Sequence, residues 1–276
     1  MRIAILQNFI DILRRKIYYL PFLVEKFKCL QRQNNVRTLI LGSSHLEMGY
    51  KPDVDKQELN MATMSQDLYY SYNLYKLCNE MHGDIENIVI SYSVFTQGHS
   101  LVWTNLSSLC VMFKSIFGID YQYPEVARNK KCFWLEPFYN WEVKQLLKKD
   151  KSIKKSRIDE SAPTRFNVKQ IETIALNHFK NHQRPVSQVH YLVKILEEAN
   201  ARNQKVIIVL PPVTNVYKNA LLDKELFNKL YESVKEFQNI KILDYYHSDY
   251  FNDNDFCDGD HVNSEGAKKL TSLIRS

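Results

Sequence analysis

A serine, a histidine and an aspartate lie in two short segments near opposite ends of the chain. Ser44 falls in Gly42-Ser43-Ser44-His45, and the second segment runs from Asp258 through His261 to Ala267. A serine hydroxyl is a poor nucleophile at neutral pH, so it requires a base within hydrogen-bond reach and a third group that orients this base. Asp258 precedes His261 by three residues, and this spacing allows its carboxylate to fold back to Nδ1 and leaves Nε2 free for a serine. These residues predict nucleophilic catalysis by Ser44, with His261 as the base and Asp258 as its partner.

The two segments resemble the SGNH hydrolases, also called GDSL esterases and lipases, and their O-acyltransferase relatives. In that family the catalytic aspartate and histidine lie in a run that typically reads Asp-Gly-Asp-His-Leu-Asn, followed by Gly-Ala, and residues 258–267 match it nearly throughout. The family's Gly-Asp-Ser is Gly42-Ser43-Ser44 here, so a serine replaces the family's aspartate and the nucleophile is carried over onto Ser44. The resemblance implies a flavodoxin-like fold, acyl-ester chemistry and a reaction without a cofactor or metal.

The resemblance also implies an oxyanion hole, to which Ser44 contributes its backbone N–H. The family's second block, Asn-x-Gly-x-x-Gly, corresponds to residues 60–65, with Ser65 in place of the last glycine. A backbone donor requires a suitable conformation rather than a glycine side chain, so Ser65 stays a candidate donor. The third block, Gly-x-Asn-Asp, is expected after a strand at 88–92, but its asparagine is absent, and Ser93 is the candidate replacement.

His45 is the second histidine near the predicted nucleophile. Adjacent residues rarely point at each other, and the sequence shows no evident carboxylate partner for His45. We therefore predict a substrate-binding residue in the pocket wall, and we expect His45 to be dispensable for the chemistry.

Apolar runs that end at these segments predict the strands that position them. The predicted strands are 37–41, 88–92, 205–210 and 240–243, and the predicted helices are 65–82, 186–203, 217–237 and the segment that begins at 263. Strands that alternate with helices predict an α/β fold, a three-layer α/β/α sandwich with a mostly parallel sheet. Open sheets of this kind bind ligands at the C-terminal edge of their strands, where Ser44 is expected.

The interpretation favours one domain at 35–276, with a helical insertion at about 95–185. The insertion holds Trp103, Trp134 and Trp141 and a basic run from Lys144 to Arg157. Insertions after parallel strands fall on the edge that carries the site, so we expect a lid whose aromatic side chains line the pocket mouth. The basic run is better explained as a solvated surface, and no nucleic-acid-binding motif accompanies it, so no nucleic-acid partner is expected.

Residues 1–34 are interpreted as an N-terminal amphipathic helix. Apolar residues recur at alternating three- and four-residue steps, and Pro21 is expected to end this pattern. The members of the stripe are Ile3, Leu6, Ile10, Leu13, Ile17 and Leu20. Three placements stay open for residues 1–20: against the parent domain, in a membrane interface, or in a short dimerising helix.

Composition limits the remaining possibilities. Five widely spread cysteines in 276 residues argue against a disulfide scaffold or a zinc site. No secretion signal of the usual order and no apolar stretch long enough for a transmembrane helix is visible, so a cytoplasmic location is expected, with peripheral membrane contact as the alternative. The net charge of +6 suits an anionic partner.

The predicted substrate is a small-molecule or glycan ester, acted on by hydrolysis or by O-acyl transfer. The alternative is a non-catalytic SGNH-fold protein that binds a glycan or a protein partner in envelope polysaccharide assembly. The sequence leaves the oligomeric state open.

Overall fold

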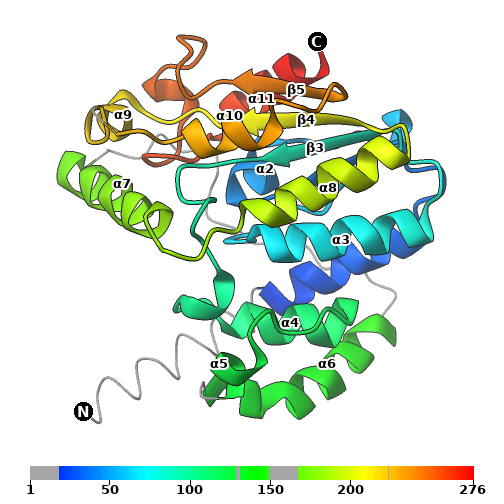
Figure 1. The fold of residues 1–276 in the computed structure, drawn as a ribbon. Helices are drawn as coiled ribbons and strands as arrows, with labels where there is room; N and C mark the ends of the chain where they lie inside the picture. Colours follow the sequence, from blue (N-terminus) through cyan, green and yellow to red (C-terminus); the bar gives the residue numbers. More distant parts are fainter. Residues whose placement is uncertain (1–18, 129–130, 149–166, 223) are drawn as a thin grey trace, which may run out of the picture. The chain divides into compact units, whose positions relative to one another are not determined.

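The computed structural model describes residues 19–128, 131–148, 167–222 and 224–276 (Figure 1). The chain forms two compact units, one from Met1–Gln33 with Leu101–Ile158 and one from Asn34–Ser100 with Asp159–Ser276.

The larger unit contains a five-stranded, wholly parallel sheet in the order β2-β1-β3-β4-β5. This is the flavodoxin-like strand order. The strands are β1 (Thr38–Leu41), β2 (Glu58–Asn60), β3 (Asn87–Ser91), β4 (Lys205–Leu210) and β5 (Ile240–Asp244). The predictions of β1, β3, β4 and β5 are confirmed. The edge strand β2 was not predicted, because a three-residue strand with one apolar side chain, Leu59, leaves no hydrophobic pattern to recognise.

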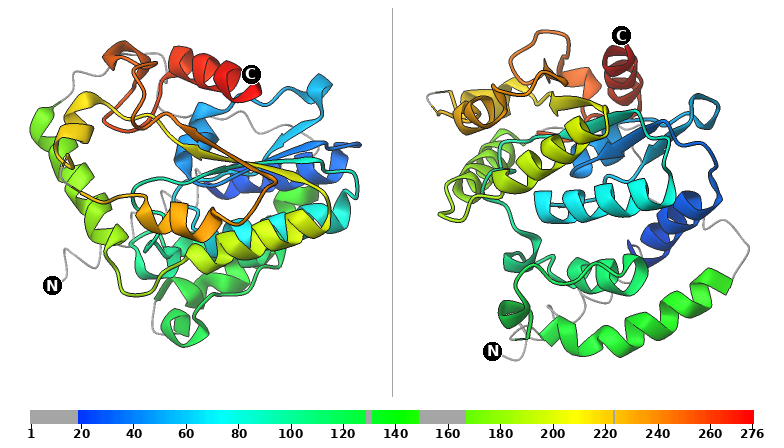
Figure 2. Two further views of the ribbon diagram at one scale, coloured as in Figure 1. Left: turned by 45° about the horizontal axis from the view of Figure 1, so that its top comes forward. Right: turned by 45° about the vertical axis from the view of Figure 1, so that its right-hand side comes forward.

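Helices cover both faces of the sheet and complete the predicted three-layer sandwich (Figures 1 and 2). On one face α3 (Leu68–Met81) packs beside α8 (Val189–Ala201), and they contact β1 and β4 respectively. On the other face α2 (Ser44–Gly49) packs against α11 (Ser264–Arg275).

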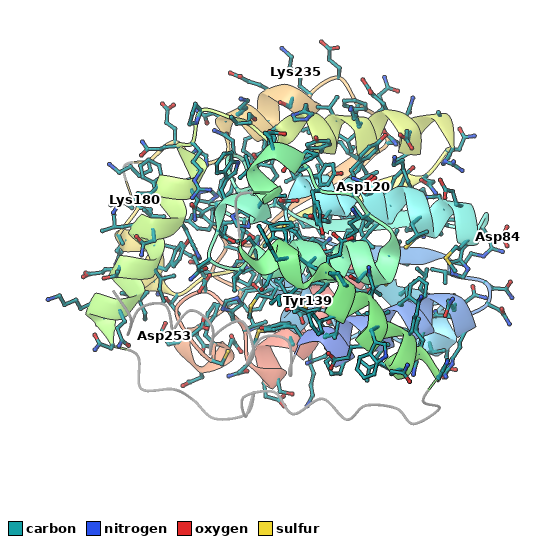
Figure 3. The ribbon with its side chains drawn as sticks, turned by 90° about the horizontal axis from the view of Figure 1, so that it is seen from below. Asp84, Asp120, Tyr139, Lys180, Lys235 and Asp253 are labelled. Atoms are coloured by element: carbon teal, nitrogen blue, oxygen red, sulfur yellow. The ribbon has the colours of Figure 1, made fainter. Side chains whose placement is uncertain are left out.

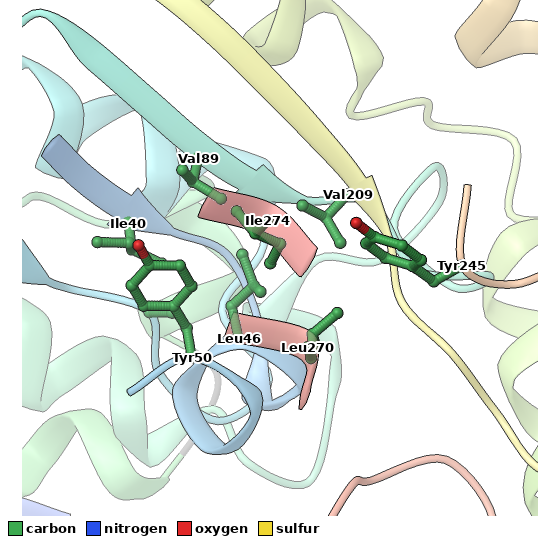
Figure 4. Packing of buried hydrophobic residues seen from close by; sticks show 9 residues of the cluster. Ile40, Leu46, Tyr50, Val89, Val209, Tyr245, Leu270 and Ile274 are labelled. Carbon is green, nitrogen blue, oxygen red and sulfur yellow. The ribbon is translucent and has the colours of Figure 1, made fainter. Parts of the chain in front are cut away.

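The packing on the second face brings the two predicted site segments together. Branched side chains of β1, β3 and β4 form a cluster with Leu46 of α2 and with Leu270 and Ile274 of α11 (Figure 4). Gly49 also lies so close to α11 that an added Cβ would meet the Leu270 side chain at 2.9 Å. Since α2 begins at Ser44 and α11 begins three residues after His261, burial of these apolar faces holds both segments at one edge of the sheet.

The predicted helix 217–237 is wrong as a continuous element. The structure has α9 (Asn215–Asn219) and α10 (Asn228–Val234), with non-helical chain between them. Leu221, Leu226 and Phe227 are buried in or beside this connection. Tertiary packing of these side chains thus overrides the local helix propensity.

The smaller unit is helical. It contains a helix over residues 19–32, α4 (Ser108–Phe117), α5 (Pro124–Arg128) and α6 (Glu136–Lys148). Tyr139 of α6 is fully buried (Figure 3). Pro21 lies within the described part of the first helix. The predicted amphipathic helix at residues 1–20 lies almost wholly outside the described residues.

The remaining elements are α7 (Val168–His182) of the larger unit and four short 3-10 helices. These are η1 (Val54–Lys56), η2 (Leu101–Trp103), η3 (Lys131–Leu135) and η4 (Asp253–Asp255). Within the described ranges, no helix combines the length and apolar character needed to cross a bilayer.

Candidate functional site

The turn that carries Ser44 depends on Gly42. Gly42 directly follows β1 with φ +116°, and a Cβ at this position would meet Ser91 Oγ at 2.1 Å and the Ser91 nitrogen at 2.9 Å. Ser43 then donates its backbone N–H to Ser91 Oγ at 3.1 Å, and α2 begins at Ser44. The close approach of this turn to the end of β3 fixes the backbone of the nucleophile position, and only glycine fits the approach.

The loop that carries His261 is organised by the carboxylate of Asp258. Asp258 Oδ1 accepts the backbone N–H of Asp260 at 3.0 Å and that of His261 at 2.8 Å. The N–H of Cys257 donates to the carbonyl of His261 at 2.9 Å, which closes the turn. Thr214 anchors the tip, because its N–H and its hydroxyl both donate to the Gly259 carbonyl, at 3.0 and 2.9 Å. The short Asp-x-x-His spacing therefore forms a turn that carries its own orienting carboxylate.

The structure brings the three predicted catalytic side chains together. Ser44 Oγ lies 2.8 Å from His261 Nε2, and His261 Nδ1 lies 3.0 and 2.9 Å from the two carboxylate oxygens of Asp258. A separation of this size allows a neutral imidazole to accept the serine proton on Nε2 while its Nδ1–H donates to Asp258. The distance expected from the sequence is confirmed.

The charges around His261 favour its protonated form. Burial by itself lowers the pKa of His261, but the carboxylates of Asp260 and Asp258, together with Glu47, raise it to about 9. An imidazolium therefore predominates at neutral pH, with its Nε2–H directed to Ser44 Oγ. The base form needed for attack is the minor form, and its population grows as the pH rises.

His45 contacts a carboxylate, contrary to the expectation that it has no such partner. Its Nε2 lies 3.3 Å from Asp260 Oδ2, and its Nδ1 lies 2.9 Å from Ser93 Oγ and 3.1 Å from Ser43 Oγ. The His45 ring stacks on that of His261, with centroids 5.1 Å apart and planes 17° apart. The premise that His45 has no carboxylate partner is therefore wrong, because Asp260 lies inside the segment where only Asp258 and His261 were assigned roles.

Asp260 is the most enclosed carboxylate of the site. Besides His45, its Oδ2 lies 3.6 Å from His178 Nδ1 of α7, and its Oδ1 lies 3.5 Å from His261 Nδ1. Burial raises the pKa of Asp260, but His261, and then His45 and His178, outweigh burial and hold the pKa well below its usual range. Asp260 is thus a buried anion surrounded by three imidazoles.

The candidate oxyanion donors lie in different environments. Ser65 has φ +56°, in the left-handed region that favours glycine, so the backbone conformation of a glycine position is present without the glycine. Ser93 donates its N–H to Thr96 Oγ1 at 2.9 Å, and its hydroxyl contacts His45. The backbone N–H of Ser93 is therefore engaged, and its hydroxyl shares His45 Nδ1 with the hydroxyl of Ser43, 3.1 Å from that nitrogen. The backbone N–H groups of Ser44 and Ser65 are then the better candidates for an oxyanion hole.

His45, Asp260 and His261 also offer three ligand atoms within 4.8 Å of one another, close enough to hold a metal ion. Two imidazoles and a carboxylate form a common transition-metal set. Both nitrogens of His261 are already engaged, however, by Ser44 and by Asp258. Coordination at either nitrogen would break one bond of the serine–histidine–aspartate arrangement, so the hydrogen-bonded network is the better description of this site.

Part of the predicted insertion contributes to the site within the larger unit. Phe95 packs against His45, His99 and His178, with ring centroids 5.9, 5.0 and 4.8 Å apart. His99 donates from Nε2 to the backbone carbonyl of Ser65 at 2.9 Å, and burial lowers the pKa of His99 to about 4, so this ring is neutral. The tryptophans belong to the smaller unit, and the lid stays a prediction. Of the basic run, the segment at 149–157 lies outside the described residues.

Comparisons with known proteins add little to this geometry. No protein-family model matches the chain, and no curated protein matches it. A solved structure that does match is that of a protein from Streptococcus pneumonia provisionally named a platelet activating factor. It is 11% identical, with a TM-score of 0.44, and the match covers 100% of this chain and 98% of that one. A likeness of this size supports no conclusion about function, which must be inferred from the site itself.

Proposed function

We propose that this chain is a serine-dependent acyl-ester hydrolase or O-acyltransferase of the SGNH type, with Ser44 as the nucleophile. One observation carries the proposal: His261 lies 2.8 Å from Ser44 Oγ through Nε2 and 2.9 Å from Asp258 through Nδ1. A serine, a base and a group that orients the base are the parts of an activated nucleophile, and here they come from segments far apart in the sequence.

The reaction begins when neutral His261 accepts the Ser44 proton and Ser44 Oγ forms a bond to the ester carbonyl carbon. The carbonyl oxygen becomes an oxyanion, which the N–H groups of Ser44 and Ser65 are positioned to bind under this proposal. Collapse of the intermediate breaks the bond to the leaving alcohol, and the imidazolium of His261 returns the proton to that alcohol. Water or a second hydroxyl then attacks acyl-Ser44, again with His261 as base, and releases an acid or a new ester.

The proposed substrate is an acylated glycan or a similar ester. Phe95 packs against the rings of His45 and His178, so aromatic side chains surround the proposed nucleophile and its base. An aromatic wall with a few polar groups suits a short acyl group on a sugar. The acceptor of the acyl group decides between hydrolysis and transfer: water gives hydrolysis, and a sugar hydroxyl gives transfer. The proposal includes a role in envelope polysaccharide chemistry, which also depends on this acceptor.

Turnover of acetylated monosaccharides and acetylated glycans by purified protein tests the proposal, with Ser44→Ala as the control. We expect the wild-type protein to release acetate, or to form an acetylated acceptor when an unmodified sugar is added in excess. We expect Ser44→Ala to give neither product. Equal activity of the two proteins on every ester would contradict the proposal. Glycan binding without turnover would instead support the non-catalytic alternative.

A further inference from the structure

We infer that Asp260, rather than Asp258, is the carboxylate that sets the charge state of His261, and that the two aspartates of the loop have divided roles. This inference rests on the proposed function, because it assigns His261 as the base. Asp258 makes the direct bond to Nδ1 and so fixes the tautomer and the ring orientation. Asp260 lies slightly farther away and acts through its buried charge, as a positioning residue for the protonated base.

The difference in exposure between the two carboxylates carries the inference. The Asp258 side chain is 46% exposed, whereas that of Asp260 is 3% exposed. Water screens an exposed charge, so at a similar distance a buried carboxylate interacts with an imidazolium several times more strongly. Asp260 Oδ1 lies 3.5 Å from His261 Nδ1, and Asp258 Oδ2 lies 2.9 Å from the same atom. This difference in distance is small compared with the difference in solvent exposure.

The surroundings of Asp260 show why its charge is directed at the histidines. Its Oδ2 is buried and makes no hydrogen bond of good geometry within the described residues. A buried anion with few hydrogen bonds requires nearby positive charge, and the available partners are imidazoles. The other titratable groups that face this pair from neighbouring elements are His45 and Glu47 of α2, His178 of α7 and Tyr217 of α9.

Asp258→Asn and Asp260→Asn form a matched pair that tests the division of roles. The readouts are the titration midpoint of His261, followed by the ring nitrogen shifts in nuclear magnetic resonance, and the pH dependence of ester turnover. We expect Asp260→Asn to lower the midpoint by at least about one pH unit and to move the pH profile by the same amount. We expect Asp258→Asn to lower the midpoint less, but to reduce the plateau rate about a hundredfold or more through loss of the tautomer.

A larger midpoint change in Asp258→Asn than in Asp260→Asn would overturn the inference. If Asp260→Asn does not fold, His45→Gln provides a test that keeps Asp260. In this variant the titration midpoint of His261 is expected to stay at the wild-type value or above it. A fall in this midpoint would also overturn the inference. Absence of any ester turnover in the wild-type protein would refute the proposed function, while the resonance titration would still measure the effect of Asp260.

A different observation, in the smaller unit, carries a second proposal. Trp134, Phe138 and Trp141 are 79, 65 and 64% exposed, although side chains of this size are normally buried. Phe138, Trp141 and Lys148 follow one another at helical spacing along α6, and exposed Lys144 flanks them. The opposite side of the helix is buried through Tyr139 and Val143.

We propose that the aromatic face formed by Trp134 of η3 and by Phe138 and Trp141 of α6 docks on an anionic lipid surface. Tryptophan and phenylalanine insert favourably at the boundary between headgroups and acyl chains, and lysines beside them attract anionic headgroups.

Vesicles of phosphatidylcholine, with or without phosphatidylglycerol, test this surface with the full chain. We expect cosedimentation and a blue shift of tryptophan emission that depend on phosphatidylglycerol and weaken with salt. A Trp134→Ser/Phe138→Ser/Trp141→Ser variant is expected to lose binding at least tenfold, whereas Leu222→Ser, which changes an exposed residue of the larger unit, is expected to retain it. Equal binding by both variants, or a dimer that forms through these aromatic residues while vesicles are ignored, would contradict the proposal.

Discussion

The pH dependence of activity provides the most quantitative prediction. The pKa of His261 is raised from 6.5 to about 9, because the carboxylates of Asp260 and Asp258 outweigh the effect of burial. Only neutral His261 can accept the Ser44 proton, so the active fraction falls tenfold for each pH unit below that value. With a pKa of about 9, we expect about one molecule in a hundred to carry neutral His261 at pH 7, and about one in a thousand at pH 6.

The assay is the initial rate of ester turnover per molecule of folded protein between pH 5.5 and 9.5, corrected for spontaneous hydrolysis. We expect the rate to rise about tenfold per pH unit and to level off near pH 9. A profile that is already level above pH 7 would refute the reasoning, because it would place the pKa of the base at or below its ordinary value.

Thermal stability should change in the opposite direction over the same range. A folded-state pKa above the unfolded value stabilises the protein below pH 6.5, and this contribution is lost as the pH rises through about 9. The loss is on the order of 1–3 kcal/mol, or a few degrees in Tm. A His261→Gln variant should lack this part of the pH dependence, and an identical Tm profile for both proteins would contradict the assignment of the charge to His261.

Two further predictions concern the residues around the nucleophile. Gly42→Ala should lower the free energy of unfolding by about 2–5 kcal/mol and lower activity more than a hundredfold, because the new Cβ would overlap Ser91. Denaturant unfolding measures the first effect and ester turnover the second. Values near those of the wild-type protein would be incompatible with the described turn. His45→Ala should lower turnover by about ten- to two-hundredfold, and His261→Ala by several orders of magnitude, so equal losses would leave His261 without a special role.

The elements that the sequence predicted well are those with strong local patterns. The apolar runs of β1, β3, β4 and β5 and the Asp-x-x-His spacing are local features, and the structure confirms the strands and the Ser44–His261 distance. The edge strand β2 and the break between α9 and α10 depend instead on tertiary packing.

The role of Asp260 illustrates the same limit within the site. The sequence shows that Asp260 is near His261, but its burial and its contact with His45 arise only when α2 and α7 pack against the loop. In the same way, the left-handed conformation of Ser65 has no signal in its residue type. The burial and the backbone conformation of single polar residues could therefore not be predicted from the sequence and became visible only in the three-dimensional structure.

The most direct test of the central claim is to identify which serine reacts with a fluorophosphonate probe. Purified protein is labelled near pH 9, and peptide mass spectrometry locates the adduct, with Ser43→Ala and Ser44→Ala as matched variants. Both serines lie near an imidazole, since Ser43 Oγ is 3.1 Å from His45 Nδ1 and Ser44 Oγ is 2.8 Å from His261 Nε2. We expect the adduct on Ser44, its loss in Ser44→Ala and its persistence in Ser43→Ala. An adduct on Ser43, or no adduct on folded wild-type protein, would contradict the assignment of Ser44 as the activated nucleophile.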